Sequence, residues 1–268
     1  MANITLPDGS VKQLPDGSTV LDLASSIGQR LAQAAVAAKV DGKVVDLATK
    51  LTGDHAVSIL TDRDPEALLV LRHSTAHVMA EAIQRIWPGA LLAYGPALDT
   101  GFYYDMALDA PISSNDFPRI EAEMEKIVKE DRPFTRYELS VDEGMNRLQK
   151  EGNKYKIDNA QRAAQGGASC LSWYVTGQKD QNWEDLCMGP HVPSTGRIKG
   201  FKVMSVASSN WHGDVKSDRF QRVYGTAFST RSSSTPTSSN WRKRRNVTTA
   251  SWARSSTSSP STTPSDRA

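Results

Sequence analysis

Few features of this sequence point to a secreted or membrane-bound protein. Only Cys170 and Cys187 are cysteines among 268 residues, so the sequence does not indicate a disulfide framework. No apolar run approaches the ~18 residues that a membrane-spanning helix needs. The N-terminus lacks the basic and apolar regions of a signal peptide. We therefore expect a cytoplasmic protein with free thiols and no membrane contact.

Charge is unevenly distributed along the chain. Residues 1–228 carry 25 Lys and Arg against 29 Asp and Glu, whereas residues 229–268 carry 7 basic residues against 1 acidic residue. Ser and Thr supply 21 of those last 40 residues, and no apolar periodicity remains. Such a segment cannot bury enough apolar surface to offset its ordering entropy. We expect residues 229–268 to be disordered.

The first 63 residues combine turn signals with short apolar segments. Pro7-Asp8-Gly9-Ser10 separates two short strand candidates and predicts a hairpin. Thr19 is a suitable cap for one helix that continues to Ala34 at helical spacing. Further strands are expected at residues 36–40, 43–45 and 56–60. This order predicts a small ubiquitin-like (β-grasp) α+β domain over residues 1–63.

Residues 64–228 show the pattern of a second, larger α+β domain. Asp64-Pro65 is a helix start, with Asp as the cap, and Pro88-Gly89 is a helix stop. Further helices are expected at residues 119–130 and 141–150, the latter behind a capping box that begins at Ser140. Strands are expected at residues 91–94, 101–105, 171–176 and 201–206.

Three of the five histidines fall into two short motifs. His73 and His77 are four residues apart, so they share one face of the first helix of this domain. Asp185, Cys187 and His191 lie within seven residues of one another. If the two motifs meet, three imidazoles and a thiol could hold a tetrahedral zinc or could position water and move protons. The alternative is a solvent-facing pair of histidines beside an ordinary loop.

Several segments resemble threonyl-tRNA synthetases. Residues 71–82, 101–105, 183–196 and 224–228 closely resemble the proofreading (second additional) domain of that family. Residues 4–61 resemble the TGS domain that precedes it. The resemblance covers roughly residues 3–228 and implies a TGS domain followed by a tRNA-editing domain.

The resemblance implies hydrolysis of tRNA(Thr) mischarged with serine. Serine lacks one methyl group of threonine, and a missing methylene gives only ~1–3 kcal/mol of discrimination, so a second, hydrolytic site is needed. His73 and His77 would orient or activate the attacking water. Lys156, expected in a polar loop, would contact the terminal adenosine or polarise the ester. Asp185 would hold the amino group of serine.

The remaining implied residues form the wall of this pocket. Cys187 and His191 would complete it, and Tyr104 would line it. Met188 stands where the family usually has Arg. If that Arg holds the loop by hydrogen bonds in the family, the loop would be looser in this chain. His212 stands where the family often has a basic residue, and it is given no role.

The resemblance also sets the expected cofactors and partners. No cofactor or metal is expected, although zinc on His73, His77, Cys187 and His191 is the alternative, because related alanyl domains bind it there. ATP, Mg and a further zinc belong to the aminoacylation core of the parent family. We expect that core to be missing from this chain, so the chain should not ligate threonine. We expect weak binding of tRNA(Thr). We also expect a monomer, because the parent family usually dimerises through its core.

Residues 229–268 read as an out-of-frame translation of the family's continuation, with a genuine low-complexity tail as the alternative. Two other functions stay open. One is a free-standing trans-editing deacylase, and the other is a non-enzymatic TGS-type module that binds RNA or a ligand.

Overall fold

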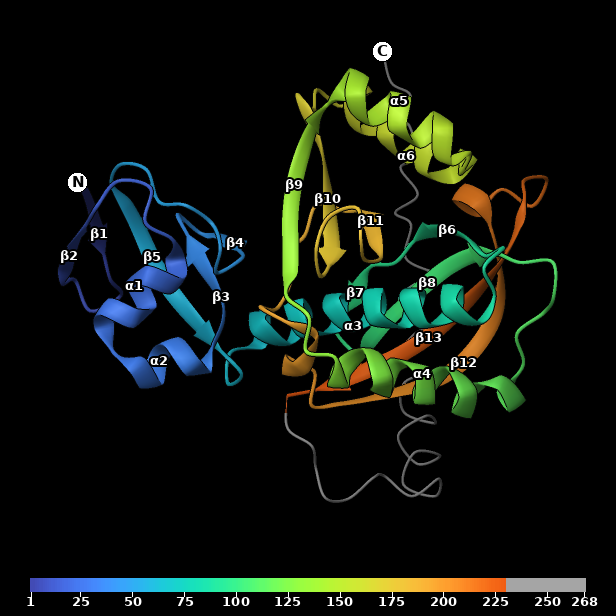
Figure 1. Ribbon diagram of the computed structural model, residues 1–268, viewed down its shortest axis with the longest axis horizontal. Coiled ribbons are helices and arrows are strands. Elements are labelled where there is room, and N and C mark those ends of the chain that lie inside the picture. Colours follow the sequence, from blue (N-terminus) through green and yellow to red (C-terminus); the bar gives the residue numbers. More distant parts are fainter. Residues whose placement is uncertain (230–268) are drawn as a thin grey trace, which may run out of the picture. The chain divides into compact units, whose positions relative to one another are not determined.

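The computed structural model describes residues 1–229, which form a mixed α+β fold as predicted (Figure 1). The expectation of a disordered tail concerns residues that lie, apart from Ser229, outside this described part. Within the described part, no helix combines the length and the apolar character that crossing a membrane requires.

The N-terminal part is a five-stranded sheet in the order β2-β1-β5-β3-β4, with β1 and β5 parallel. Ile4, Leu23 and Val57 belong to its buried core. The predicted hairpin is confirmed, since Asp8 accepts hydrogen bonds from the Ser10 backbone and hydroxyl. The elements are β1 (Ala2–Thr5), β2 (Val11–Leu14), α1 (Val20–Ile27), α2 (Gln29–Ala34), β3 (Ala35–Val40), β4 (Lys43–Val45) and β5 (His55–Thr61).

The expectation of one continuous helix after Thr19 is wrong, because two helices occupy this segment. Thr19 does cap α1, in a capping box with Asp22, but the helix ends at Ile27 and a separate helix follows Gly28. Gly28 is extended, with φ 169° and ψ 143°. Glycine costs about 1 kcal/mol relative to alanine inside a helix, so Gly28 favours a break. The apolar spacing continues across this break, which is why it suggested one helix.

The second part is built on the sheet β12-β13-β8-β6, with β7 paired to β8. Helices α3 and α4 pack on each other and on this sheet (Figure 1). Met79, Ile83, Phe102 and Ile120 are buried between these layers. The elements are α3 (Pro65–Ile86), β6 (Leu91–Tyr94), β7 (Ala97–Leu98), β8 (Gly101–Ala107), α4 (Phe117–Lys129), β12 (Gly200–Asn210) and β13 (Arg219–Phe228), with 3-10 helices η1 (Ser114–Asp116), η2 (Thr195–Arg197) and η3 (Trp211–Gly213).

A separate three-stranded sheet, β11-β10-β9, carries two helices that follow one another in the chain. Trp173 is buried on it with Leu148 and Ala160. The capping box at Ser140 is confirmed, whereas β9 and α6 were not predicted. The elements are β9 (Phe134–Ser140), α5 (Val141–Glu151), α6 (Lys154–Gln165), β10 (Cys170–Thr176) and β11 (Glu184–Leu186).

Candidate functional site

Helix α3 presents two histidines on one face. His73 and His77 are one turn apart, and their ring centroids are 5.1 Å from each other. His77 is only 2% exposed. Asp64 precedes the helix as expected, but its carboxylate accepts hydrogen bonds from Thr61 and makes no side-chain cap bond to the helix. His77 is thus buried and His73 is half-buried, so the alternative of a solvent-facing pair is wrong.

The loop after β11 brings the second motif to this face. Gly189 has φ +73°, which L side chains rarely adopt, and a Cβ there would stand 2.0 Å from the Tyr174 hydroxyl oxygen. Only glycine lets the backbone pass so close to this tyrosine. The turn carries His191 back over α3, where its ring stacks on Phe134 with centroids 4.8 Å apart.

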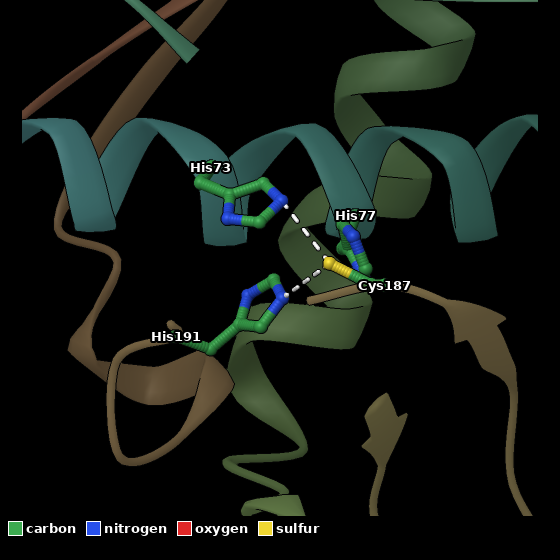
Figure 2. Close-up of side chains that lie close together, drawn as sticks. All are labelled: His73, His77, Cys187 and His191. Atoms are coloured by element: carbon green, nitrogen blue, oxygen red, sulfur yellow. Dashed lines mark hydrogen bonds between the residues drawn. The ribbon is translucent and has the colours of Figure 1, made fainter. Parts of the chain in front are cut away.

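Figure 2 shows how the two motifs meet around a sulfur atom. The Cys187 Sγ lies 3.3 Å from His73 Nε2 and 3.5 Å from His191 Nε2. His77 completes the group, with its ring centroid 4.3 Å from that of His191. The four side chains each offer a ligand atom, and these atoms all lie within 4.8 Å of one another.

A buried ion pair adjoins this cluster. The Lys156 Nζ lies 2.5 Å from Asp185 Oδ1 and donates a hydrogen bond to the Tyr104 hydroxyl at 3.1 Å. Tyr104 donates in turn to the other oxygen of Asp185. His77 Nε2 is 4.0 Å from that same oxygen, so the ion pair and the imidazoles are neighbours.

Lys156 does not lie in the polar loop that the sequence suggested. It belongs to the first turn of α6, where the Asn153 side chain accepts hydrogen bonds from the backbone N–H groups of Tyr155 and Lys156. Tyr155 and Ala160 are buried by the neighbouring elements. Tertiary packing therefore forms a helix from residues that are mostly polar in sequence.

Burial controls the ionisation of the cluster. It lowers the pKa of His73 and takes the pKa values of His77 and His191 well below the usual value for histidine. Burial also raises the pKa of Cys187 to about 12. At neutral pH the cluster consequently contains neutral imidazoles, which can accept protons, and a protonated thiol.

The same side chains fit a tetrahedral metal ion. Bonds of ~2.0–2.3 Å to nitrogen and sulfur would place neighbouring ligand atoms roughly 3.3–3.7 Å apart, and the two contacts of Cys187 Sγ already have these lengths, 3.3 and 3.5 Å. In addition, His77 Nδ1 is buried without a hydrogen-bond partner among the described residues. The four residues would hold the ion and fill its tetrahedral coordination, and a bound zinc would act as a Lewis acid only if one of them left a position open.

Some residues around the cluster were not identified from the sequence. The Ser74 hydroxyl lies 3.1 Å from His191 Nδ1, and Tyr174 packs against the His191 ring. Ser74 stands inside the His73–His77 motif, but its contact with His191 depends on where the loop after β11 lies. Met188, which stands where the family usually has Arg, is not buried near these residues but is 87% exposed. His212 pairs with Asp158 at 2.7 Å, apart from the cluster.

Comparison with known proteins identifies both parts of the chain. The TGS domain family matches residues 2–61, and the "Threonyl and Alanyl tRNA synthetase second additional domain" family matches residues 174–224.

Relatives named threonine–tRNA ligase extend the match over most of the chain. The protein from Pelobacter propionicus is 46% identical over 226 residues, covering 84% of this chain and 34% of the relative. The protein from Desulforamulus reducens is 47% identical over 228 residues, covering 85% and 35%. This chain thus spans about a third of the length of these relatives. It carries the N-terminal region of a threonyl-tRNA synthetase, consisting of the TGS domain and the editing, or second additional, domain.

Proposed function

We propose that this chain hydrolyses the ester bond of serine wrongly attached to tRNA(Thr). The observation that supports this best is the meeting of three neutral imidazoles and a thiol beside the buried Lys156–Asp185 pair. Such a site offers proton acceptors, a positive charge and a carboxylate together. We assign no threonine ligation to these 268 residues, because the resemblance places the ATP-dependent chemistry in a different part of the parent enzymes.

The imidazoles would activate water. His73 Nδ1 lies 3.2 Å from the Pro190 carbonyl oxygen, which can only accept a hydrogen bond. Its proton therefore belongs on Nδ1, and its Nε2 lone pair faces the Cys187 thiol at 3.3 Å. In the proposed reaction this histidine, together with His77, orients a water that attacks the ester carbonyl carbon. A proton passes from the water to an imidazole, and the imidazolium returns it to the ribose oxygen of the terminal adenosine as the bond to serine breaks.

The ion pair would bind the reacting groups. Lys156 places a positive charge where it can polarise the ester carbonyl or contact the terminal adenosine, and Asp185 can hold the serine ammonium group. Tyr104, which bonds to both, would line the pocket. Cys187 and His191 would complete its wall. The thiol is protonated at neutral pH, since its pKa is about 12, which favours water over sulfur as the nucleophile.

We propose that hydrolysis proceeds without a metal, because Lys156 already supplies a positive charge at the site. Incubation with a chelator such as 1,10-phenanthroline should leave the rate of serine release unchanged. Loss of activity that stoichiometric zinc restores would instead assign a metal to the four side chains.

Binding of tRNA(Thr) by the chain is proposed to be weak. Residues 1–228 carry more acidic than basic residues, 29 against 25, and phosphate neutralisation dominates nucleic-acid affinity. We expect the chain alone to be monomeric. Because few phosphates would be neutralised, KM for Ser-tRNA(Thr) should rise only gently with salt.

The direct test is release of labelled serine from Ser-tRNA(Thr) by the purified chain. His73→Ala should reduce the rate by about 100-fold, the usual order for loss of a general base. His212→Ala is the matched control, because His212 makes an ion pair apart from the cluster and should keep full activity. A wild-type rate no faster than buffer, or an undiminished His73→Ala rate, would overturn the proposal.

A further inference from the structure

Ser74 occupies the centre of the contact between α3 and the loop that carries His191. Its side chain is fully buried, with 0% exposed. Three groups surround the hydroxyl oxygen: the Val70 carbonyl oxygen at 2.9 Å, the Val192 backbone nitrogen at 3.0 Å and His191 Nδ1 at 3.1 Å. The hydroxyl has a single proton and two lone pairs, so these three contacts restrict where the protons lie.

The contacts favour one arrangement of protons. The Val70 carbonyl can only accept, and the Val192 N–H can only donate. If Ser74 donates to Val70, all three contacts become hydrogen bonds, provided that His191 carries its proton on Nδ1 and donates it to the hydroxyl. His191 Nε2 then has a free lone pair directed at Cys187 Sγ, 3.5 Å away.

The opposite tautomer is poorer. With the proton on Nε2, His191 would donate to sulfur, which is a weak acceptor, and Ser74 would have to donate to Nδ1. The bond to the Val70 carbonyl would then be lost. The O–H···O=C bond to Val70 would be exchanged for a weak N–H···S contact. The Val70 carbonyl would then be left buried without this bond, which disfavours the Nε2–H tautomer.

We propose that Ser74 is a positioning residue that holds His191 in the Nδ1–H tautomer, with its Nε2 lone pair turned toward Cys187 and the reacting groups. The same hydroxyl ties the backbone of Val192 to α3, so one side chain fixes both the position of the loop and the proton on its imidazole. This inference rests on the proposed hydrolytic function for its purpose, but the tautomer itself is independent of activity.

The tautomer can be read directly from the imidazole ¹⁵N–¹H correlation spectrum of the full chain. Wild-type His191 should show a protonated Nδ1 and an unprotonated Nε2. Ser74→Ala should shift His191 toward the Nε2–H form and lower kcat for serine release by about 10- to 100-fold, part of a general-base contribution, with little change in KM. Ser74→Cys, which keeps a similar shape but offers only a weak acceptor, should move both readouts in the same direction if Ser74→Ala folds poorly.

Thr75→Val is the matched control. Thr75 is the next residue of the same helix, is equally buried, and makes the same type of bond to a carbonyl four residues earlier, at 2.7 Å to Leu71. It has no hydrogen bond to His191, so its loss should leave the tautomer and kcat unchanged. An Nε2–H tautomer in the wild type would overturn the inference, as would equal effects of the Ser74 and Thr75 variants. If the wild type releases no serine, the proposed function fails and the spectrum still decides the tautomer.

Discussion

At the scale of single residues, the buried histidines connect the site to the stability of the fold. Burial lowers the pKa of His73, His77 and His191, so the unfolded chain takes up protons on these residues before the folded chain does. Their contribution to stability is complete above the unfolded pKa, near 6.5, and is lost as the pH falls below it. The partly exposed His55, beside Asp41, has a raised pKa and opposes this trend weakly.

We therefore predict that the free energy of unfolding falls between pH 7 and pH 5.5. Each of these histidines can contribute a slope of at most about 1.4 kcal/mol per pH unit, reached between its folded and unfolded pKa values. Urea unfolding at several pH values measures this slope, and His77→Gln should make it shallower. A stability that is flat or rises toward pH 5.5 would show that the imidazoles are not held neutral.

Lys156 offers a second prediction at this scale. Replacing it by Met leaves the Asp185 carboxylate buried without its cation, which should cost about 3 kcal/mol in unfolding free energy and abolish serine release. Lys154, two residues away, pairs with Asp218 at the surface. Lys154→Met should change neither stability nor activity appreciably. Chemical unfolding and serine release measure both effects, and similar losses in the two variants would contradict a special role for Lys156.

The sequence was sufficient to find the residues of the cluster but not all of their contacts. The four-residue spacing of His73 and His77 fixes their common face, and the density of Asp185, Cys187 and His191 marked the second motif. The contact of Ser74 depends on where a distant loop lies. No local pattern of a serine inside a helix encodes that position.

At the scale of elements, the cap of α6 determines where Lys156 stands. Asn153 caps the first turn of this helix, and its Nδ2 also donates to the Leu92 carbonyl of β6 at 2.8 Å. Asn153→Ala should cost about 1 kcal/mol of stability and also reduce serine release, because the turn that carries Lys156 loses its anchor.

Ser140→Ala is the control for this prediction. Ser140 caps α5 in a capping box with Glu143, so its loss should cost a similar amount of stability. Helix α5 contributes no residue to the cluster, so serine release should be unaffected. Unfolding curves and serine-release rates of Asn153→Ala and Ser140→Ala separate the effect on stability from the effect on the site. Equal serine-release rates in the two variants would show that the cap of α6 does not position Lys156 for the reaction.

Elements with strong local signals were predicted well, and those without them were missed. Helices α3, α4 and α5 have clear apolar spacing with a cap or an early proline, and their predicted bounds were close. Strand β9 was missed because Phe134, Tyr137 and Leu139 do not alternate strictly. Helix α6 was missed because its sequence is mostly polar, so only its packing against β6 and β10 reveals it.

At the scale of the whole molecule, the arrangement places the cluster of three histidines and Cys187 between helix α3 and the loop after β11. The chain also carries a TGS domain and spans about a third of the threonine–tRNA ligases that it matches. The α+β class followed from composition and the order of elements. The pairing of strands distant in sequence, such as β8 with β13, required the three-dimensional structure.

Selectivity for serine can be tested by comparing two substrates on the wild-type chain. Single-turnover release of the amino acid should be measured from Ser-tRNA(Thr) and from Thr-tRNA(Thr) under identical conditions. We predict that serine is released faster by about 10-fold or more, since one methyl group supplies about 1–3 kcal/mol of discrimination. Equal rates would rule out a proofreading role, because a site that hydrolyses both esters alike cannot correct mischarging with serine.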